Sequence, residues 1–124
     1  DLVDLCLAAI DQKLDQVESK WDPRASIGIV LAAGGYPAAY NKGDVISGLP
    51  QVEIEGEKVF HAGTDNKDGN IVTNGGRVLC ATALGNSVSE AQQRAYELAK
   101  QISWDGMFHR SDIGYRAIAR EQEK

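Results

Sequence analysis

The sequence predicts an α+β domain in which an antiparallel sheet has helices packed on one side. Three observations predict this class. A leading helical pattern occupies residues 1–20, short apolar runs separated by glycine-rich turns fill residues 26–85, and a capped helical pattern covers residues 87–103. Strands gathered between helices are typical of sheets whose helices lie on one face. With 124 residues, the chain is expected to form a single domain over residues 1–124.

The first element is expected to be an amphipathic helix over residues 2–17. Its apolar residues recur at steps of three and four, and acidic and amide residues fall between them. We expect the helix to end before Pro23, since proline cannot continue a helix. The helical register starts at residue 1 with no serine or threonine cap ahead of it. Because the first amides of a helix need partners, we expect the chain to be a piece of a longer protein.

Residues 26–85 are expected to be mainly strands. The run SIGIVLAAGG is apolar on both alternations, so both faces of its strand are expected to be covered. The alternation in VEIEGEKVFHAG predicts a β-hairpin that turns near Gly56, and the DG dipeptide of DNKDGN predicts a tight turn between two strands. A short strand is expected around Val45 and Ile46, and RVLCATALG predicts a buried strand after a glycine turn.

Two helices are expected after the strands. Ser87 and Glu90 form a capping box that begins the helix over residues 87–103. The buried stripe of this helix is expected at Val88, Ala91, Ala95, Leu98 and Ile102. A short terminal helix is expected over residues 111–121, with Ser111 as its cap.

Composition and charge argue against several kinds of partner. The formal net charge is −5 and the pI is about 4.9, whereas a general nucleic-acid binder carries excess positive charge to neutralise phosphates. No apolar run approaches the ~20 residues that a membrane span needs. Cys6 and Cys80 show no C-x-x-C spacing and are interpreted as reduced core thiols. We therefore expect a cytoplasmic protein with no nucleic-acid or membrane partner.

The sequence shows no complete active site. Neither His61 nor His109 has a second histidine or a cysteine at metal-ligand spacing, so no metal site is expected within the chain. No serine stands in a G-x-S-x-G setting, and no cysteine is paired with a nearby histidine. The phosphate loop G-x-x-x-x-G-K-[ST] is also absent from the sequence. We expect no catalytic residue in this chain.

Two glycine-rich corners are the candidate binding elements. They consist of Gly34, Gly35 and Pro37 after the first apolar strand, and of Gly75, Gly76 and Arg77 before the last one. Glycine allows backbone amides to approach a ligand closely, and an arginine fork can bind phosphate through two hydrogen bonds. Glycine pairs most often simply make turns, so an anion site and an ordinary turn are both open at this point.

Five separated motifs carry a resemblance to a known family. They are RASIGIVLAAGGYP, KVFHAGT, VTNGGRVLCATALG, SEAQQRAYELAKQI and WDGMFHRSDIGYRA. Together, and in this order, they resemble the C-terminal domain of the glycinamide ribonucleotide synthetases, also called phosphoribosylamine–glycine ligases, of the ATP-grasp superfamily. The resemblance runs over residues 1–121 and implies a half-barrel-like antiparallel sheet of the ATP-grasp C-terminal domain type.

The resemblance implies a parent enzyme of purine biosynthesis. In this family ATP phosphorylates glycine to glycyl phosphate, and the amine of 5-phosphoribosylamine attacks that acyl phosphate to give glycinamide ribonucleotide, ADP and phosphate. The N-terminal and central ATP-grasp domains are the expected partners of this chain. ATP and Mg²⁺ (or Mn²⁺) are the expected cofactors, with their ligands outside the chain, so the fragment alone is expected to be inactive.

The resemblance also implies roles for the two corners. Arg77, supported by the amides of Gly75 and Gly76, is expected to contact the 5′-phosphate of phosphoribosylamine. The other corner, Gly34, Gly35 and Pro37, is expected to form a neighbouring rim. Arg110 and Asp112 are interpreted as an ion pair that fixes the tail to the body, with an Arg110 that faces the cleft as the alternative. A free-standing sugar-phosphate binding module and an inert scaffold are the alternatives for the whole chain.

Overall fold

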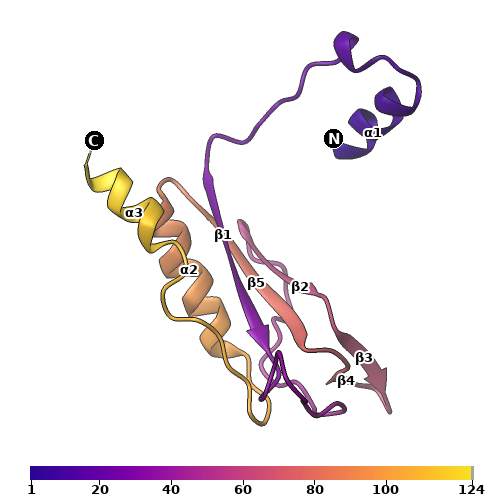
Figure 1. The fold of residues 1–124 in the computed structure, drawn as a ribbon, viewed down its shortest axis with the longest axis vertical. Coiled ribbons are helices and arrows are strands. Elements are labelled where there is room, and N and C mark those ends of the chain that lie inside the picture. The colour runs from indigo at the N-terminus through magenta and orange to yellow at the C-terminus, as the bar shows by residue number, and fades with distance from the viewer. Residues whose placement is uncertain (124) are drawn as a thin grey trace.

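A computed structural model describes residues 1–123 and confirms the α+β class with antiparallel strands. Figure 1 shows the course of the chain, from a separate N-terminal helix through the sheet to two C-terminal helices. The elements are α1 (Leu2–Ile10), the 3₁₀ helix η1 (Leu14–Gln16), β1 (Ala25–Ala32), β2 (Glu57–His61), β3 (Thr64–Lys67), β4 (Asn70–Thr73), β5 (Arg77–Gly85), α2 (Val88–Gln101) and α3 (Tyr115–Gln122).

The main sheet has three antiparallel strands in the order β1-β5-β2, and β3 and β4 form a separate two-stranded sheet. The turn between β3 and β4 is the predicted DG turn. Asp68 and Gly69 both have positive φ angles, 52° and 80°, which a two-residue hairpin turn of this twist requires. The expected short strand appears only as single bridges, from Val45 to Val72 and from Ser47 to Ser103.

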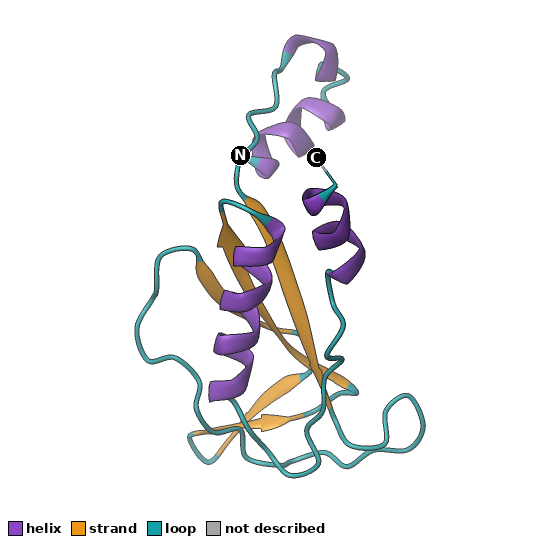
Figure 2. Ribbon diagram, turned by 90° about the vertical axis from the view of Figure 1, so that its left-hand side faces the viewer, coloured by secondary structure: helices purple, strands orange, loops and turns teal. Residues whose placement is uncertain are grey.

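Helix α2 covers one face of the main sheet (Figure 2). The predicted stripe is confirmed at its centre, since Ala91, Ala95, Leu98 and Ile102 are all buried. The sheet presents Ile29, Leu31, Leu79, Ala81 and Ala83 to the same core. Alanines on both surfaces leave room for the helix to approach the strands closely. Ser87 caps the helix by accepting a hydrogen bond from Glu90 N at 3.0 Å, as the capping box predicts.

The opposite face of the main sheet is open in this chain. Val30 and Phe60 flank Cys80 in register across the three strands, and their side chains are 43% and 54% exposed. The expectation that both faces of the first strand are covered is therefore wrong for these 124 residues. Its other alternation, with Ile29 and Leu31, is buried as expected.

The leading helix is shorter than the sequence predicts. It ends at Ile10, because Gln12 adopts a positive φ of 57° that breaks the helical path, and Leu14–Gln16 then form a 3₁₀ turn. Asp1 itself caps α1 by accepting a hydrogen bond from Val3 N at 2.9 Å, so the first turn is not uncapped as expected. Cys6 lies on this helix as a free thiol, but it is exposed rather than part of the core.

Two further elements differ from expectation. Residues 52–55 form no strand, and the predicted hairpin is reduced to a turn in which Glu57 N donates to Ile54 O at 3.0 Å. The terminal helix begins at Tyr115 with Gly114 at its cap position, rather than at Ser111. Within residues 1–123, no helix has the length and apolar character that crossing a membrane would require.

Candidate functional site

The two predicted glycine corners lie side by side at one end of the main sheet. This follows from topology: β1 and β5 are antiparallel, so the end of β1 and the start of β5 meet. Ala32 is paired with Arg77 across the two strands, and Ala33 N donates a hydrogen bond to Gly76 O at 2.9 Å. The chain thus brings together residues about forty positions apart into one surface, hereafter called the rim, made of residues 34–37 and 75–77.

Aromatic packing explains why residue 76 is a glycine. A Cβ atom placed on Gly76 would lie 2.1 Å from Tyr36 Cδ2, closer than a Cβ atom can approach, and would also be crowded by Tyr40 Cε1 at 3.0 Å. The Tyr36 and Tyr40 rings are themselves neighbours, with centroids 6.2 Å apart. Tyr36 therefore packs on the backbone immediately before Arg77. Sequence patterns carry no signal for this contact.

A third glycine completes the rim. A Cβ on Gly63 would lie 2.7 Å from Arg77 O and 2.8 Å from Gly75 Cα, and Asn74 N donates to Gly63 O at 2.8 Å. Gly63 was not among the predicted site residues, although it belongs to the KVFHAGT motif. On the other corner, a Cβ on Gly34 would lie 2.8 Å from Gly106 O. The rim is thus assembled by backbone packed directly on backbone.

Arg77 is the first residue of β5, and it is exposed next to the glycines of the rim. Within residues 1–123, no hydrogen bond or ion pair occupies its guanidinium, whereas Arg24, Arg94 and Arg110 each bind a carboxylate. The Arg77 side chain is therefore available to an anion that approaches from outside the domain. The amides of Gly75 and Gly76 are close to it in sequence, as a phosphate cradle would need.

Arg110 and Asp112 form the predicted ion pair, with Arg110 Nη2 at 2.6 Å from Asp112 Oδ2. Their hydrogen bond raises the pKa of the Arg110 guanidinium and lowers the pKa of the Asp112 carboxyl. The pair links residues two positions apart, so it does not by itself attach the tail to the body. Tyr96 of α2 does so: its hydroxyl donates to Arg110 O at 2.8 Å and accepts from Ile113 N at 3.1 Å.

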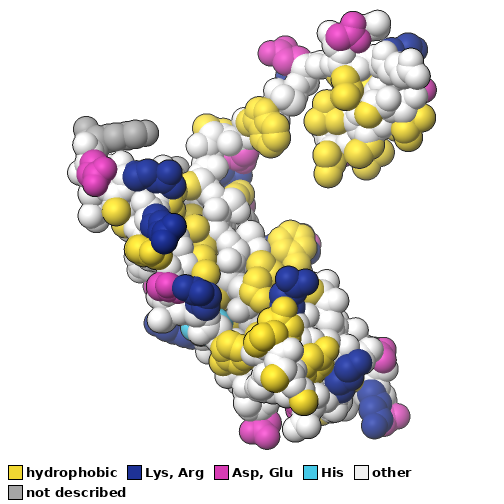
Figure 3. All heavy atoms as spheres, in the orientation of Figure 1, with side chains coloured by type: hydrophobic (Ala, Val, Ile, Leu, Met, Phe, Trp, Pro, Cys, Tyr) yellow, Lys and Arg dark blue, Asp and Glu magenta, His cyan; other side chains and the backbone are white. Residues whose placement is uncertain are grey.

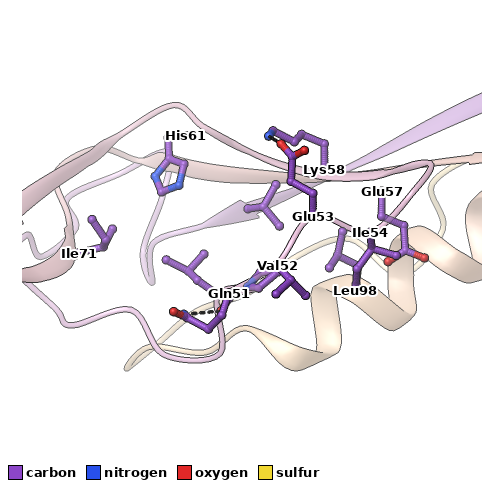
Figure 4. A pocket seen from close by; sticks show the side chains of 12 residues that line it. Gln51, Val52, Glu53, Ile54, Glu57, Lys58, His61, Ile71 and Leu98 are labelled. Atoms are coloured by element: carbon purple, nitrogen blue, oxygen red, sulfur yellow. Dashed lines mark hydrogen bonds and ion pairs between the residues drawn. The ribbon is translucent and has the colours of Figure 1, made fainter.

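A hollow of about 430 Å³ lies beside β2 (Figure 4), and residues 34–37 and 75–77 of the rim are not among those that line it. Its lining residues are Leu49, Pro50, Gln51, Val52, Glu53, Ile54, Glu57, Lys58, Val59, His61, Ile71 and Leu98. Charged groups here are already paired, Lys58 with Glu53 and Glu57 with Arg94, both at 3.1 Å. The sequence patterns do not predict this hollow, since they indicate a strand over residues 52–55.

Possible metal ligands are dispersed over the described residues. No group of three histidine, cysteine, aspartate or glutamate side chains within residues 1–123 could hold a metal ion. His61 Nδ1 shares a hydrogen bond of 2.9 Å with Thr64 Oγ1, so its partner is a hydroxyl and not a nucleophilic cysteine. The fold and the rim together define a small α+β domain with one exposed arginine-and-glycine surface that faces outward.

Comparison with known proteins identifies the family. A sequence model described as phosphoribosylglycinamide synthetase, C domain, matches residues 26–116, so the chain belongs to this family as its C domain. It is 97% identical, over its whole length, to the phosphoribosylamine–glycine ligase of Vibrio parahaemolyticus, and 64% identical to that of Haemophilus influenzae. The chain spans 29% of the length of these curated relatives.

A solved structure supports the same conclusion. The crystal structure of the phosphoribosylamine–glycine ligase from Thermotoga maritima matches with a TM-score of 0.69 at 39% identity. The match covers 86% of this chain and 27% of that one.

Proposed function

We propose that the chain is the C-terminal part of a ligase that joins glycine to 5-phosphoribosylamine in purine biosynthesis. The observation that carries this proposal is the family match over residues 26–116, together with 97% identity to a protein named for that reaction. In the net reaction the γ-phosphoryl group of ATP is transferred to the glycine carboxylate. The amine then displaces phosphate from the acyl carbon and forms the amide bond of glycinamide ribonucleotide.

The part that this chain plays is to wall the cleft and to hold the phosphate of phosphoribosylamine. Arg77 supports this role because its guanidinium is exposed and lies beside the backbone of Gly75 and Gly76. A doubly hydrogen-bonded arginine fixes a phosphate in orientation as well as in position. Holding the phosphate would place the amine of the sugar at a constant distance from the acyl phosphate, which lowers the entropic part of the barrier.

The nucleotide and its Mg²⁺ do not fit the residues of this chain. The sequence contains no phosphate loop, and residues 1–123 offer no cluster of metal-ligating side chains. We therefore infer that their ligands lie in the central ATP-grasp domain of the parent. A cytoplasmic location of the parent is part of the same proposal.

A coupled assay for ADP release tests this division of labour. The intact parent should turn over in the presence of ATP, Mg²⁺, glycine and phosphoribosylamine, whereas the 124-residue chain should show no turnover above background. Turnover by the chain alone would contradict the proposal. Binding of ribose 5-phosphate by the chain alone, lost in Arg77→Ala, would favour a free-standing sugar-phosphate module.

Steady-state kinetics of the parent test the role of Arg77. Loss of a charged phosphate contact costs about 1.5–3 kcal/mol, so Arg77→Ala should raise the KM for phosphoribosylamine by roughly 10- to 150-fold. The KM values for ATP and glycine should stay near their original values. Arg120→Ala is a matched control, because Arg120 is also exposed but lies on α3. An unchanged KM in Arg77→Ala would support the scaffold alternative.

A further inference from the structure

Residues 36–43 lie alongside the turn of residues 74–76, hereafter called the glycine turn. A Cβ on Gly76 would lie 2.6 Å from Tyr36 Cε2, so the Tyr36 ring contacts the backbone of this turn. The Tyr40 ring reaches the same glycine, and Gly76 is buried. The first half of the segment is therefore fixed to the end of the glycine turn that leads into β5.

The second half of the segment is fixed to the start of the glycine turn. Thr73, which is 1% exposed, accepts a hydrogen bond from Gly43 N through its carbonyl at 2.7 Å. Its amide donates to Asp44 O at 2.9 Å, and its hydroxyl accepts from Asp44 N at 3.1 Å. Lys42 lies between these bonds and Tyr40, so contacts on both of its sides place it next to the glycine turn.

The charge of Lys42 has no partner within residues 1–123. Its side chain is exposed and takes part in none of the ion pairs between these residues, whereas Lys58 and Arg94 each bind a carboxylate. Arg77, at the other end of the glycine turn, is exposed and unpaired among the described residues in the same way. Two cationic side chains that are available to an external anion therefore lie at the two ends of one turn.

The charge of a phosphate monoester explains why one cation is not enough. Such a group carries a charge of about −1.5 to −2 at pH 7, and a single guanidinium leaves part of it without a partner. Figure 3 shows lysine and arginine side chains dispersed over the face in view, and the formal net charge of the chain is −5. Because no broad positive field compensates the remaining charge, a second cation has to stand at the site itself.

We propose that Lys42 is a second binding residue for the phosphate of phosphoribosylamine, and that it acts together with Arg77 across the glycine turn. This inference rests on the function proposed above. The two side chains divide the task, because a guanidinium fixes the orientation of a phosphate through two hydrogen bonds, whereas an ammonium supplies a compact charge. Loss of Lys42 should therefore weaken substrate binding and leave kcat near its original value. The local sequence, a turn-rich loop, carries no signal for this role.

Steady-state kinetics of the parent ligase test the proposal. Lys42→Gln removes the charge and should raise the KM for phosphoribosylamine about tenfold, with the KM values for ATP and glycine unchanged. Lys42→Arg keeps the charge and should restore the KM to within about threefold of its original value. A rise in KM that Lys42→Arg does not restore would indicate a packing role and would overturn the proposal.

Lys67→Gln is the matched control. Lys67 is also an exposed lysine without an ion pair among the described residues, but it is paired with Asn70, at the end of the β3–β4 hairpin opposite Thr73. The KM for phosphoribosylamine should therefore stay the same in this variant. An unchanged KM in Lys42→Gln, or an equal rise in Lys67→Gln, would contradict the assignment.

Equilibrium binding separates this site from the proposed function. Ribose 5-phosphate and ribose differ only in the phosphate, so Lys42→Gln should weaken binding of ribose 5-phosphate to the parent about tenfold at low salt and leave binding of ribose unchanged. If this dependence on Lys42 were found in a parent that does not turn over glycine and phosphoribosylamine, the site would stand and the function would fail. Turnover by a parent whose affinity for ribose 5-phosphate does not depend on Lys42 would overturn the site and leave the function in place.

Discussion

Helices α1 and α2 belong to the same chain but stand in opposite relations to it. Helix α2 buries a stripe of alanines and Leu98 on the sheet and exposes Glu97 and Lys100 to water. Helix α1 has a larger share of apolar residues and buries none of them. The helix with the larger share of apolar residues is thus the one that has no buried residue. The difference indicates that α2 is stabilised by packing on this sheet, whereas α1 gains little from the described residues.

Truncating one apolar side chain on each helix gives the largest expected difference in stability between α2 and α1. Leu98→Ala removes a side chain that is 1% exposed, and should lower the free energy of unfolding of the chain by about 2–5 kcal/mol. Leu7→Ala on α1 should change it by less than about 0.5 kcal/mol, since Leu7 is 56% exposed and no residue of α1 is buried. Urea unfolding of both variants measures the difference. Similar losses would mean that α1 contributes to the same cooperative unit.

Removing the N-cap side chain of each helix tests the same difference, with a smaller expected loss of stability. Ser87→Ala removes the hydroxyl that binds Glu90 N and should destabilise the chain by about 1 kcal/mol. Asp1→Ala removes the equivalent bond to Val3 N, but should leave the global transition of the isolated chain in place. Thermal unfolding followed by circular dichroism at one protein concentration compares the two. A shift caused by Asp1→Ala would show that α1 unfolds together with the sheet.

The first turn of α2 has a second anionic partner. Glu121 of α3 accepts hydrogen bonds from Val88 N at 2.7 Å and from Ser89 N at 3.3 Å. Glu121→Gln removes a negative charge from a helix N-terminus and should destabilise the chain by about 0.3–1 kcal/mol, less at high salt. Glu123→Gln is the control, because it changes the same charge outside these bonds. A loss that is independent of salt would argue against an electrostatic cause.

The smallest expected effect on stability comes from the ion pair between Arg110 and Asp112, in the segment that Tyr96 of α2 binds. The Arg110 guanidinium lowers the pKa of the Asp112 carboxyl, so the pair's contribution to stability is present above the ordinary carboxyl pKa and is lost as pH falls through the lowered one. Arg110→Gln should move the pKa of Asp112 back toward its ordinary value. An NMR titration of the carboxyl carbon measures this shift. An unchanged pKa would mean that the ion pair does not persist in solution.

Local signals in the sequence predicted the elements whose causes are local. The capping box at Ser87, the stripe from Ala91 to Ile102 and the DG turn each depend on residues within a few positions, and all three appear in the structure. The alternation in VEIE was wrong as a prediction of a strand. Only a single bridge joins Ile54 to Glu57, and β2 remains an edge strand in the order β1-β5-β2.

Two other errors concern apolar residues that no described residue covers. Residues 2–17 have helical periodicity, yet Gln12 ends the helix and no core supports its continuation past Ile10. Val30 sits in an apolar run but faces an open side of the sheet. The sequence patterns singled out residues of both glycine corners of the rim as candidate binding residues. The contact of Tyr36 with Gly76 and the role of Gly63 depend on three-dimensional packing that no spacing in the sequence encodes.

The bonds from Glu121 to the start of α2 have a consequence for how the protein is made. Val88 and Glu121 are 33 residues apart, so a ribosome must complete nearly the whole domain before this carboxylate reaches the waiting amides. A nascent chain arrested before residue 121 would leave those two amides to water. Helix α3 can therefore stabilise the first turn of α2 only after nearly all of this chain has been synthesised.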